Sequence, residues 1–225
     1  PAPVVAARAD PEAIFGDTQA YIAAGIDEIG QLADHLLGAG VAAQKVTILG
    51  TAASESIART ALTLARLMAR ERNVVVVDLA ASRPRIPAVS VDPNAPGLAE
   101  LMRGEASFAQ IITRDQLSRA HLVGAGRPGF DRTRLHSPRL RLVIDALLEV
   151  YDHVLLDAGA ASDLPAELLT AQARAVVVPD ASMAANARAL MVEQLKAVGF
   201  SEVTMLSKPY RPSDAVDPGW HVAAA

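Results

Sequence analysis

One stretch, residues 46–65, constrains the fold of this 225-residue chain more than any other. It opens with a strand-like run (Val46 to Leu49) and continues through a turn of small residues (Gly50 to Ser54). An amphipathic helical pattern follows directly. A strand, a short loop and a helix in this order form the scaffold of a phosphate-binding loop. The stretch therefore predicts an α/β fold of the nucleotide-binding kind.

The rest of the chain repeats the alternation of strand and helix patterns. Apolar, β-branched runs predict further strands at Val74 to Val77, Ala120 to Val123, Val154 to Leu156, Ala175 to Val178 and Val203 to Leu206. Helical patterns lie at 17–37, 98–103, 108–112, 138–147, 164–171 and 187–198, with Gly38 expected to stop the first of them. Regular alternation of this kind predicts a doubly wound, mainly parallel sheet flanked by helices.

The domain organisation expected from these patterns is simple. Residues 1–16 are predicted to form a flexible arm or linker, residues 17–207 a single P-loop NTPase-like domain, and residues 208–225 an irregular tail. Because the chain begins at Pro1 rather than methionine, the sequence leaves open whether it is a fragment of a membrane-anchored protein or a separate subunit.

Composition excludes several classes of function. The net charge of -4 gives no basic footprint for nucleic acid. The absence of cysteine excludes disulfides and thiol catalysis. No apolar run approaches the roughly 20 residues that a transmembrane helix needs, so no membrane span is predicted. The five histidines lack metal-ligand spacing, and no metal site is predicted from them.

The turn after the first strand lacks the groups that a working phosphate-binding loop uses. Such a loop needs a glycine, then a lysine that reaches the phosphates, then a serine or threonine that binds the metal. Aligned by the helix, these positions fall on Ser56, Ile57 and Ala58, while Ser54 lies in the turn before them. The interpretation is a degenerate loop; the alternative is nucleotide binding through backbone N–H groups and the helix dipole.

Two carboxylates and two arginines follow the predicted strands at the rim where α/β sheets bind ligands. Asp78 ends the second strand, and Asp157 is expected to end the strand that begins at Val154. They are interpreted as relic acids that cap neighbouring loops, with a residual metal site as the alternative. Arg83 and Arg85 are candidate contacts for an anion or a partner protein, or are simply solvated.

Five blocks of sequence, in this order, resemble the bacterial tyrosine kinases of capsule and exopolysaccharide export, which are relatives of the ParA/MinD-type NTPases. The blocks are D-L-A-A-S-R-P-R (78–85), P-G-L-A-E-L-M-R-G-E (96–105), L-V-G-A-G-R-P (122–128), S-P-R-L-R-L-V-I-D-A-L (137–147) and Y-D-H-V-L-L-D (151–157). The resemblance covers roughly residues 46–206 and implies a P-loop NTPase-like fold of the SIMIBI type.

The departures from the family pattern concern its active parts. Ile57 and Ala58 replace the lysine and the hydroxyl residue, and Ala80 replaces a second aspartate. The charged ring-forming positions of the family are best matched by Gln19, Ile22 and Gly25, and Tyr210 is the only tyrosine in the tail.

The resemblance and its departures together imply a non-catalytic pseudo-kinase or pseudo-ATPase domain that acts as a scaffold or regulator in polysaccharide polymerisation, chain-length control and export. No cofactor is expected, with ATP and Mg²⁺ only if the degenerate loop still binds them. Expected partners are proteins of a membrane export complex, and possible self-association, at the cytoplasmic face of the bacterial inner membrane. Partner contacts are expected on the first helix around residues 22–37, beside a collapsed cleft.

Two alternatives remain from the sequence. The first is an active ATPase or autophosphorylating tyrosine kinase with an atypical loop. The second is a ParA/MinD-like positioning factor or pilus-assembly factor.

Overall fold

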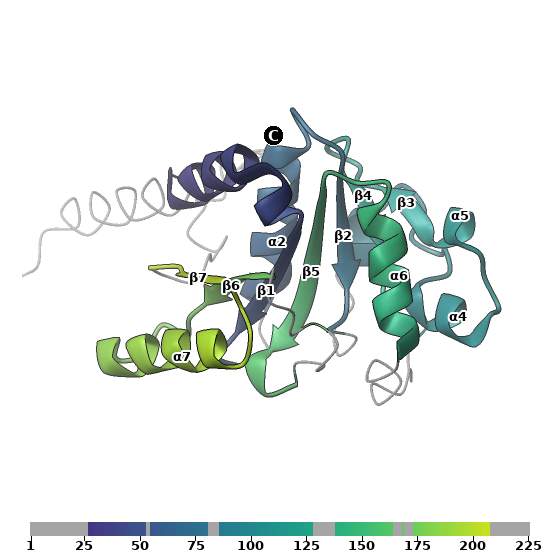
Figure 1. Cartoon of the computed structure of the whole chain (residues 1–225). Coiled ribbons are helices and arrows are strands. Elements are labelled where there is room, and N and C mark those ends of the chain that lie inside the picture. The colour runs from purple at the N-terminus through teal and green to yellow at the C-terminus, as the bar shows by residue number, and fades with distance from the viewer. Residues whose placement is uncertain are drawn as a thin grey trace, which may run out of the picture.

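A computed structural model gives the fold of the chain (Figure 1). It describes residues 27–52, 55–80, 86–127, 138–163, 168 and 173–207. The predicted arm (1–16), the tail (208–225) and nearly all of the helix predicted at 164–171 lie outside these ranges, as do Ser54, Arg83 and Arg85.

A seven-stranded sheet forms the centre of the molecule, with strand order β3-β4-β2-β5-β1-β6-β7. All neighbouring strands are parallel except β3 and β4, which are antiparallel. The strands are β1 (Lys45–Gly50), β2 (Val74–Asp78), β3 (Ile112–Arg114), β4 (His121–Val123), β5 (His153–Ala160), β6 (Arg174–Val178) and β7 (Glu202–Met205). The predicted fold class, a mainly parallel α/β sheet flanked by helices, is confirmed.

Helices cover both faces of this sheet (Figure 1). A leading helix (27–39) runs into the 3-10 turn η1 (Gly40–Ala43). The helices and 3-10 turn that follow are α2 (Glu55–Met68), α3 (Ile86–Val89), α4 (Leu98–Arg103), α5 (Phe108–Ile111), α6 (Pro138–Leu148), η3 (Ala161–Asp163) and α7 (Ala185–Ala197).

The core divides into two apolar layers, one on each face of the sheet. Side chains alternate along a strand, so Val74 and Val76 of β2 enter the layer formed with the leading helix and α2. Val75 and Val77 enter the opposite layer, which includes apolar residues of α4, α6 and α7. Burial on both faces explains why the central strands are uninterrupted apolar runs.

Strand β5 corrects one prediction. It does not end at Asp157 but continues to Ala160. The pairing with β1 shifts at this point, because Ile48 is opposite Asp157 whereas Leu49 is opposite Gly159. The extra residue, Ala158, is a bulge that keeps the strand paired beyond the carboxylate. Asp157 therefore lies inside the strand, three residues before its end.

Two helix boundaries also differ from prediction. Gly38 does not stop the leading helix, which continues to residue 39, and the left-handed residue there is Gly40 with φ of 55°. An open helix surface at Gly38 tolerates glycine, whereas a positive φ favours it. Val198, expected on the buried side of α7, is the C-cap residue and is 51% exposed, because α7 ends at Ala197.

The apolar side of the leading helix packs inside the molecule. Ile29, Leu32, Ala33 and Leu36 are buried in the first apolar layer. Near the first described residue of this helix, Glu28 Oε1 accepts hydrogen bonds from the Ser207 backbone N–H, at 2.8 Å, and from the Ser207 hydroxyl. A partner that contacts the described part of this helix would therefore meet its polar side, including Asp27, Gln31 and Asp34.

Candidate functional site

The loop between β1 and α2 is closed by an apolar side chain. Ile57, at the position where the kinase family has lysine, lies in the first turn of α2 and is 1% exposed. A methyl group added to Gly50 would lie 2.6 Å from Ile57 Cδ1, so the isoleucine packs directly on the glycine that starts the loop. Ile57 also belongs to the apolar layer that contains Ile48 and Ala61. The side chain at the lysine position thus extends the core into the loop.

The two neighbouring positions are part of the same helical turn. Ala58 is 8% exposed, and Ser56 is half-buried. The Ser56 carbonyl accepts a hydrogen bond of 2.7 Å from the buried Thr60 hydroxyl. Ala58 offers no oxygen to a metal ion, since its side chain is a methyl group.

A carboxylate occupies the N-terminal turn of α2. Glu55 is the first residue of the helix, and its Oε2 lies 3.3 Å from the Arg59 guanidinium. The N-terminus of a helix favours negative charge because its N–H groups are unpaired and its dipole is positive there. Glu55 supplies that charge from within the chain, and it would repel a phosphate that approached the same turn.

Asp78 and Asp157 lie side by side on the neighbouring strands β2 and β5. Their Cα atoms are register partners in the β2–β5 pairing, and each residue is 3% exposed. Asp78 Oδ1 accepts the Ala80 N–H at 3.0 Å, and Asp157 Oδ1 accepts the Gly159 N–H at 3.2 Å. Each carboxylate thus caps its own following backbone, in the manner of an Asx turn.

Within the described ranges, no third His, Cys, Asp or Glu side chain joins this pair in a group that could hold a metal ion. The described part of the chain also has no helix with the length and apolar character that a membrane span requires.

A second cluster, missed by sequence reasoning, joins α4 to the loop after β4. Glu100, 4% exposed, accepts hydrogen bonds from the N–H groups of Gly97 at 2.8 Å and Arg127 at 3.3 Å, and from the Arg103 guanidinium at 2.9 Å. Burial opposes ionisation of Glu100, but these bonds and the Arg103 charge outweigh it and hold the pKa below its ordinary value. The signal for the cluster is present in the sequence, because a Glu three residues after Gly97 is a capping pattern.

Glycine is required where this loop crosses the start of α4. The Leu98 N–H bonds to the Gly124 carbonyl at 2.8 Å, and the Ala99 N–H to the Ala125 carbonyl at 3.0 Å. Gly126 has φ of 100°. The blocks at 96–105 and 122–128, which carry part of the family resemblance, are therefore two halves of one structural contact.

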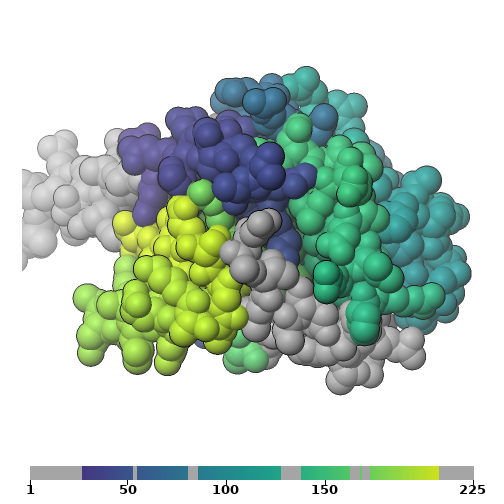
Figure 2. Space-filling view, viewed as in Figure 1, coloured from purple at the N-terminus to yellow at the C-terminus, as the bar shows by residue number. Residues whose placement is uncertain are grey.

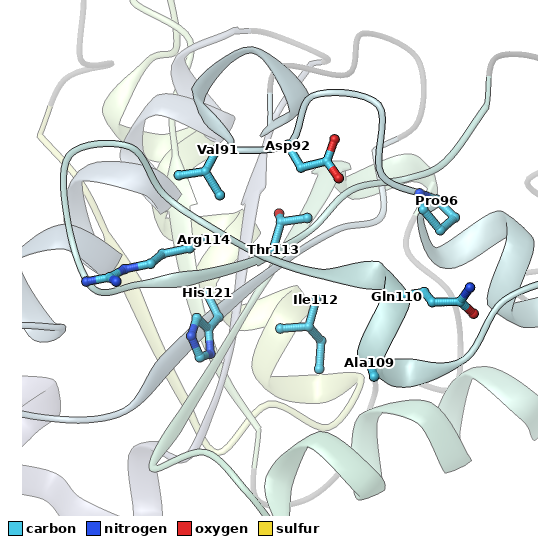
Figure 3. Close-up of a pocket in the computed structure, with 9 residues that line it drawn as sticks. All are labelled: Val91, Asp92, Pro96, Ala109, Gln110, Ile112, Thr113, Arg114 and His121. Atoms are coloured by element: carbon cyan, nitrogen blue, oxygen red, sulfur yellow. The ribbon is translucent and has the colours of Figure 1, made fainter.

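A pocket of about 550 Å³ opens at the β3 edge of the sheet (Figure 3). Its lining residues are Val91, Asp92, Pro96, Ala109, Gln110, Ile112, Thr113, Arg114 and His121. His121 Nδ1 lies 2.7 Å from the Tyr151 hydroxyl, and the two rings meet edge to face. Burial, together with the Arg114 charge, lowers the pKa of His121, and burial raises that of Tyr151. The pocket is remote from the β1–α2 loop in the strand order, since β4, β2 and β5 separate β3 from β1.

Comparison with known proteins places this geometry in a class. No protein-family model and no curated protein sequence matches the chain. Among solved structures, the kinase domain of VpsO has a TM-score of 0.67 at 18% identity, covering 87% of this chain and 98% of that one. The kinase domain of the Escherichia coli tyrosine kinase ETK has a TM-score of 0.60 at 18% identity, covering 75% and 71%.

A related ATPase shares the same architecture. The septum site-determining protein MinD from Pyrococcus horikoshii OT3, solved with Mg-ADP, has a TM-score of 0.54 at 18% identity, covering 76% of this chain and 75% of that one. The chain therefore has the fold of P-loop NTPases of the bacterial tyrosine kinase and MinD type. The resemblance inferred from the five blocks is confirmed at the level of the fold.

Proposed function

We propose that this chain is a non-catalytic pseudo-kinase domain that serves as a scaffold or regulator in a polysaccharide polymerisation and export complex. The observation that carries the proposal is the packing of Ile57 on Gly50 inside the β1–α2 loop. An apolar side chain at the lysine position supplies no charge to a phosphate and fills space beside the loop backbone.

The residues present do not fit a magnesium nucleotide bound in the family's manner. Ser56, Ile57 and Ala58 lack the glycine, the ammonium and the metal-binding hydroxyl, and Glu55 adds a negative charge at the helix start. Phosphoryl transfer depends on positioning and on charge stabilisation by these groups together. By contrast, the family blocks around Gly97 and Gly126 make structural contacts, which supports a domain that kept its fold without its chemistry.

The biological setting comes from the sequence resemblance to kinases of capsule and exopolysaccharide export. It implies protein partners in a membrane export complex, with this domain at the cytoplasmic face of the inner membrane. The similarity of the fold to the VpsO and ETK kinase domains is in keeping with that setting.

The direct test is a thermal-shift titration with Mg-ATP. We expect the melting temperature of this chain to be the same in millimolar Mg-ATP as in MgCl₂ alone. The ETK kinase domain serves as the positive control, whose melting temperature should rise. A ligand at 100 times its dissociation constant stabilises a protein by about 2.7 kcal/mol, so binding would be visible. A saturable upward shift would contradict the proposal.

A gain-of-function variant tests the loop separately. We expect Ile57→Lys to show no ATP turnover. The variant still has Ser56 in place of the glycine and Ala58 in place of the metal-binding hydroxyl residue, and these parts act as a unit. Phosphate release is the measurement, with the unmodified chain as the matched control. Turnover above that control in the single variant would mean that the loop retains a competent shape.

An active kinase or ATPase remains the second candidate, and one observation favours it. Asp78 and Asp157 are in register on adjacent strands, as a pair of acids that organises a metal ion would be. A saturable Mg-ATP shift lost in Asp78→Asn would support this candidate. A ParA/MinD-like positioning factor is a third, in keeping with the fold shared with MinD.

A further inference from the structure

The turns that precede the parallel strands gather at one end of the sheet, opposite the end that carries the β1–α2 loop. Two of them are joined there. The Arg119 guanidinium, in the β3–β4 turn (115–120), donates a hydrogen bond to the Arg70 carbonyl in the α2–β2 turn (69–73). Arg66 at the end of α2 binds the Asp115 carboxylate through two hydrogen bonds, of 3.0 and 2.7 Å. The two turns therefore form one surface, at the upper end of the molecule in Figure 2.

This surface combines positive charge with a protruding apolar side chain. Arg70, Arg72, Arg114 and Arg119 are all exposed. Leu117, at the tip of the β3–β4 turn, is 77% exposed. We refer to these five residues as the arginine patch.

Few acids oppose the charge of the arginine patch. Glu71 is exposed within it. Asp115 is buried and neutralised by Arg66, and Asp152 accepts the Asn73 N–H at 2.9 Å at the patch margin. Asp92 lines the same pocket as Arg114. Four arginines thus face three acids that Arg66 does not neutralise, in a chain whose net charge is -4. The positive charge is concentrated here against the overall balance of the molecule.

We propose that the arginine patch is a contact surface for a membrane that contains anionic lipids, with Leu117 entering the headgroup layer. Guanidinium groups bind lipid phosphates, and an aliphatic side chain at the tip of a turn can enter the acyl boundary. A stable protein–protein interface usually involves roughly 20 to 30 residues of each partner. Five side chains, four on two short turns and one at the end of β3, are too few for that, but suit a weak, charge-driven membrane contact.

Vesicle co-sedimentation tests the surface. The full chain is mixed with vesicles of phosphatidylcholine alone, or of phosphatidylcholine with phosphatidylglycerol, at low and at high salt. We expect binding only to the vesicles with phosphatidylglycerol, and loss of that binding at high salt. The double variant Arg70→Gln with Arg72→Gln should bind these vesicles about thirty-fold more weakly, since each arginine near an anionic surface contributes about 1 kcal/mol. Leu117→Ser should weaken it roughly tenfold.

Helix α6 offers matched control residues. Arg141 and Leu142 are exposed, with side-chain exposure of 72% for Arg141 and overall exposure of 66% for Leu142. Arg141→Gln with Leu142→Ser should leave vesicle binding unchanged, and all variants should keep the wild-type melting temperature. Equal loss in the α6 control, or binding to phosphatidylcholine alone, would overturn the assignment. Failure to bind vesicles would also overturn it, and retention on immobilised polyglutamate in that case would indicate an acidic protein partner instead. The Mg-ATP titration is independent of all these outcomes.

Discussion

Replacing Gly97 with alanine is expected to destabilise the protein by about 3 kcal/mol or more, the upper range for overpacking a rigid site. The added Cβ would lie 2.6 Å from Gly126 Cα and closer still to Gly126 N and Gly124 O. All three neighbours are backbone atoms, which cannot rotate away as a side chain can. The chain must instead separate α4 from the loop after β4, which breaks the hydrogen bonds from Leu98 and Ala99.

Urea unfolding followed by circular dichroism measures this effect, and two other glycines serve as controls. Gly104 has φ of 77° but nothing within 4 Å of its added Cβ, so Gly104→Ala should cost only the left-handed strain of about 1 to 2 kcal/mol. Gly30 lies in the leading helix with open space around it, so Gly30→Ala should stabilise by roughly 0.5 to 1 kcal/mol. If Gly97→Ala unfolded like Gly104→Ala, the close backbone contact would be wrong.

The central strands could be predicted from sequence because their signal is local. Val74 to Val77 form a continuous β-branched run, as is typical of a strand buried on both faces. Strand β3 was not predicted, because Ile112–Arg114 follows α5 without a turn residue between them. It becomes a strand by pairing with β4, and its first residue is opposite Val123, eleven positions further along the chain. Such pairing depends on tertiary context more than on the propensity of three residues.

The candidate site was likewise predicted only in part from the sequence. Alignment of the loop placed Ile57 at the lysine position, but the sequence alone could not show that its side chain turns onto Gly50. Likewise Asp78 and Asp157 were each predicted at the end of a strand on the sheet rim. Their pairing across β2 and β5, and the bulge at Ala158 that extends β5 beyond Asp157, were not predicted. Side-chain direction and register shifts depend on packing between elements, which periodicity does not encode.

The second large effect concerns the ion pair between Arg66 and Asp115, residues that are 49 positions apart. The Asp115 side chain is 0% exposed, and that of Arg66 is 29% exposed. Arg66→Met should destabilise the protein by about 2 to 4 kcal/mol at neutral pH. This is slightly below the range for breaking a fully buried pair, since Arg66 is partly solvated. Arg59→Met, which breaks the exposed pair with Glu55, is the matched control and should cost less than about 1 kcal/mol.

The pH dependence of that difference distinguishes the ion pair from packing. Burial opposes ionisation of Asp115, but hydrogen bonds from Arg66, Ser118 and Leu117 and the Arg66 charge lower its pKa. A carboxyl with a depressed folded pKa stabilises above its unfolded value, near 3.9, and this stability is lost as the pH falls through the folded pKa. In Arg66→Met the guanidinium that stabilises the Asp115 carboxylate is gone. Protonation of Asp115 in acid then removes an unpaired buried charge, which stabilises the variant.

The stability difference between wild type and Arg66→Met should therefore be largest near neutral pH and shrink below about pH 4. Urea unfolding at both pH values measures it. The double variant Arg66→Met with Asp115→Asn should recover part of the loss at neutral pH, because it removes the buried charge together with its partner. A difference that stayed constant with pH would show that Arg66 acts through the packing of its alkyl chain, since packing does not titrate.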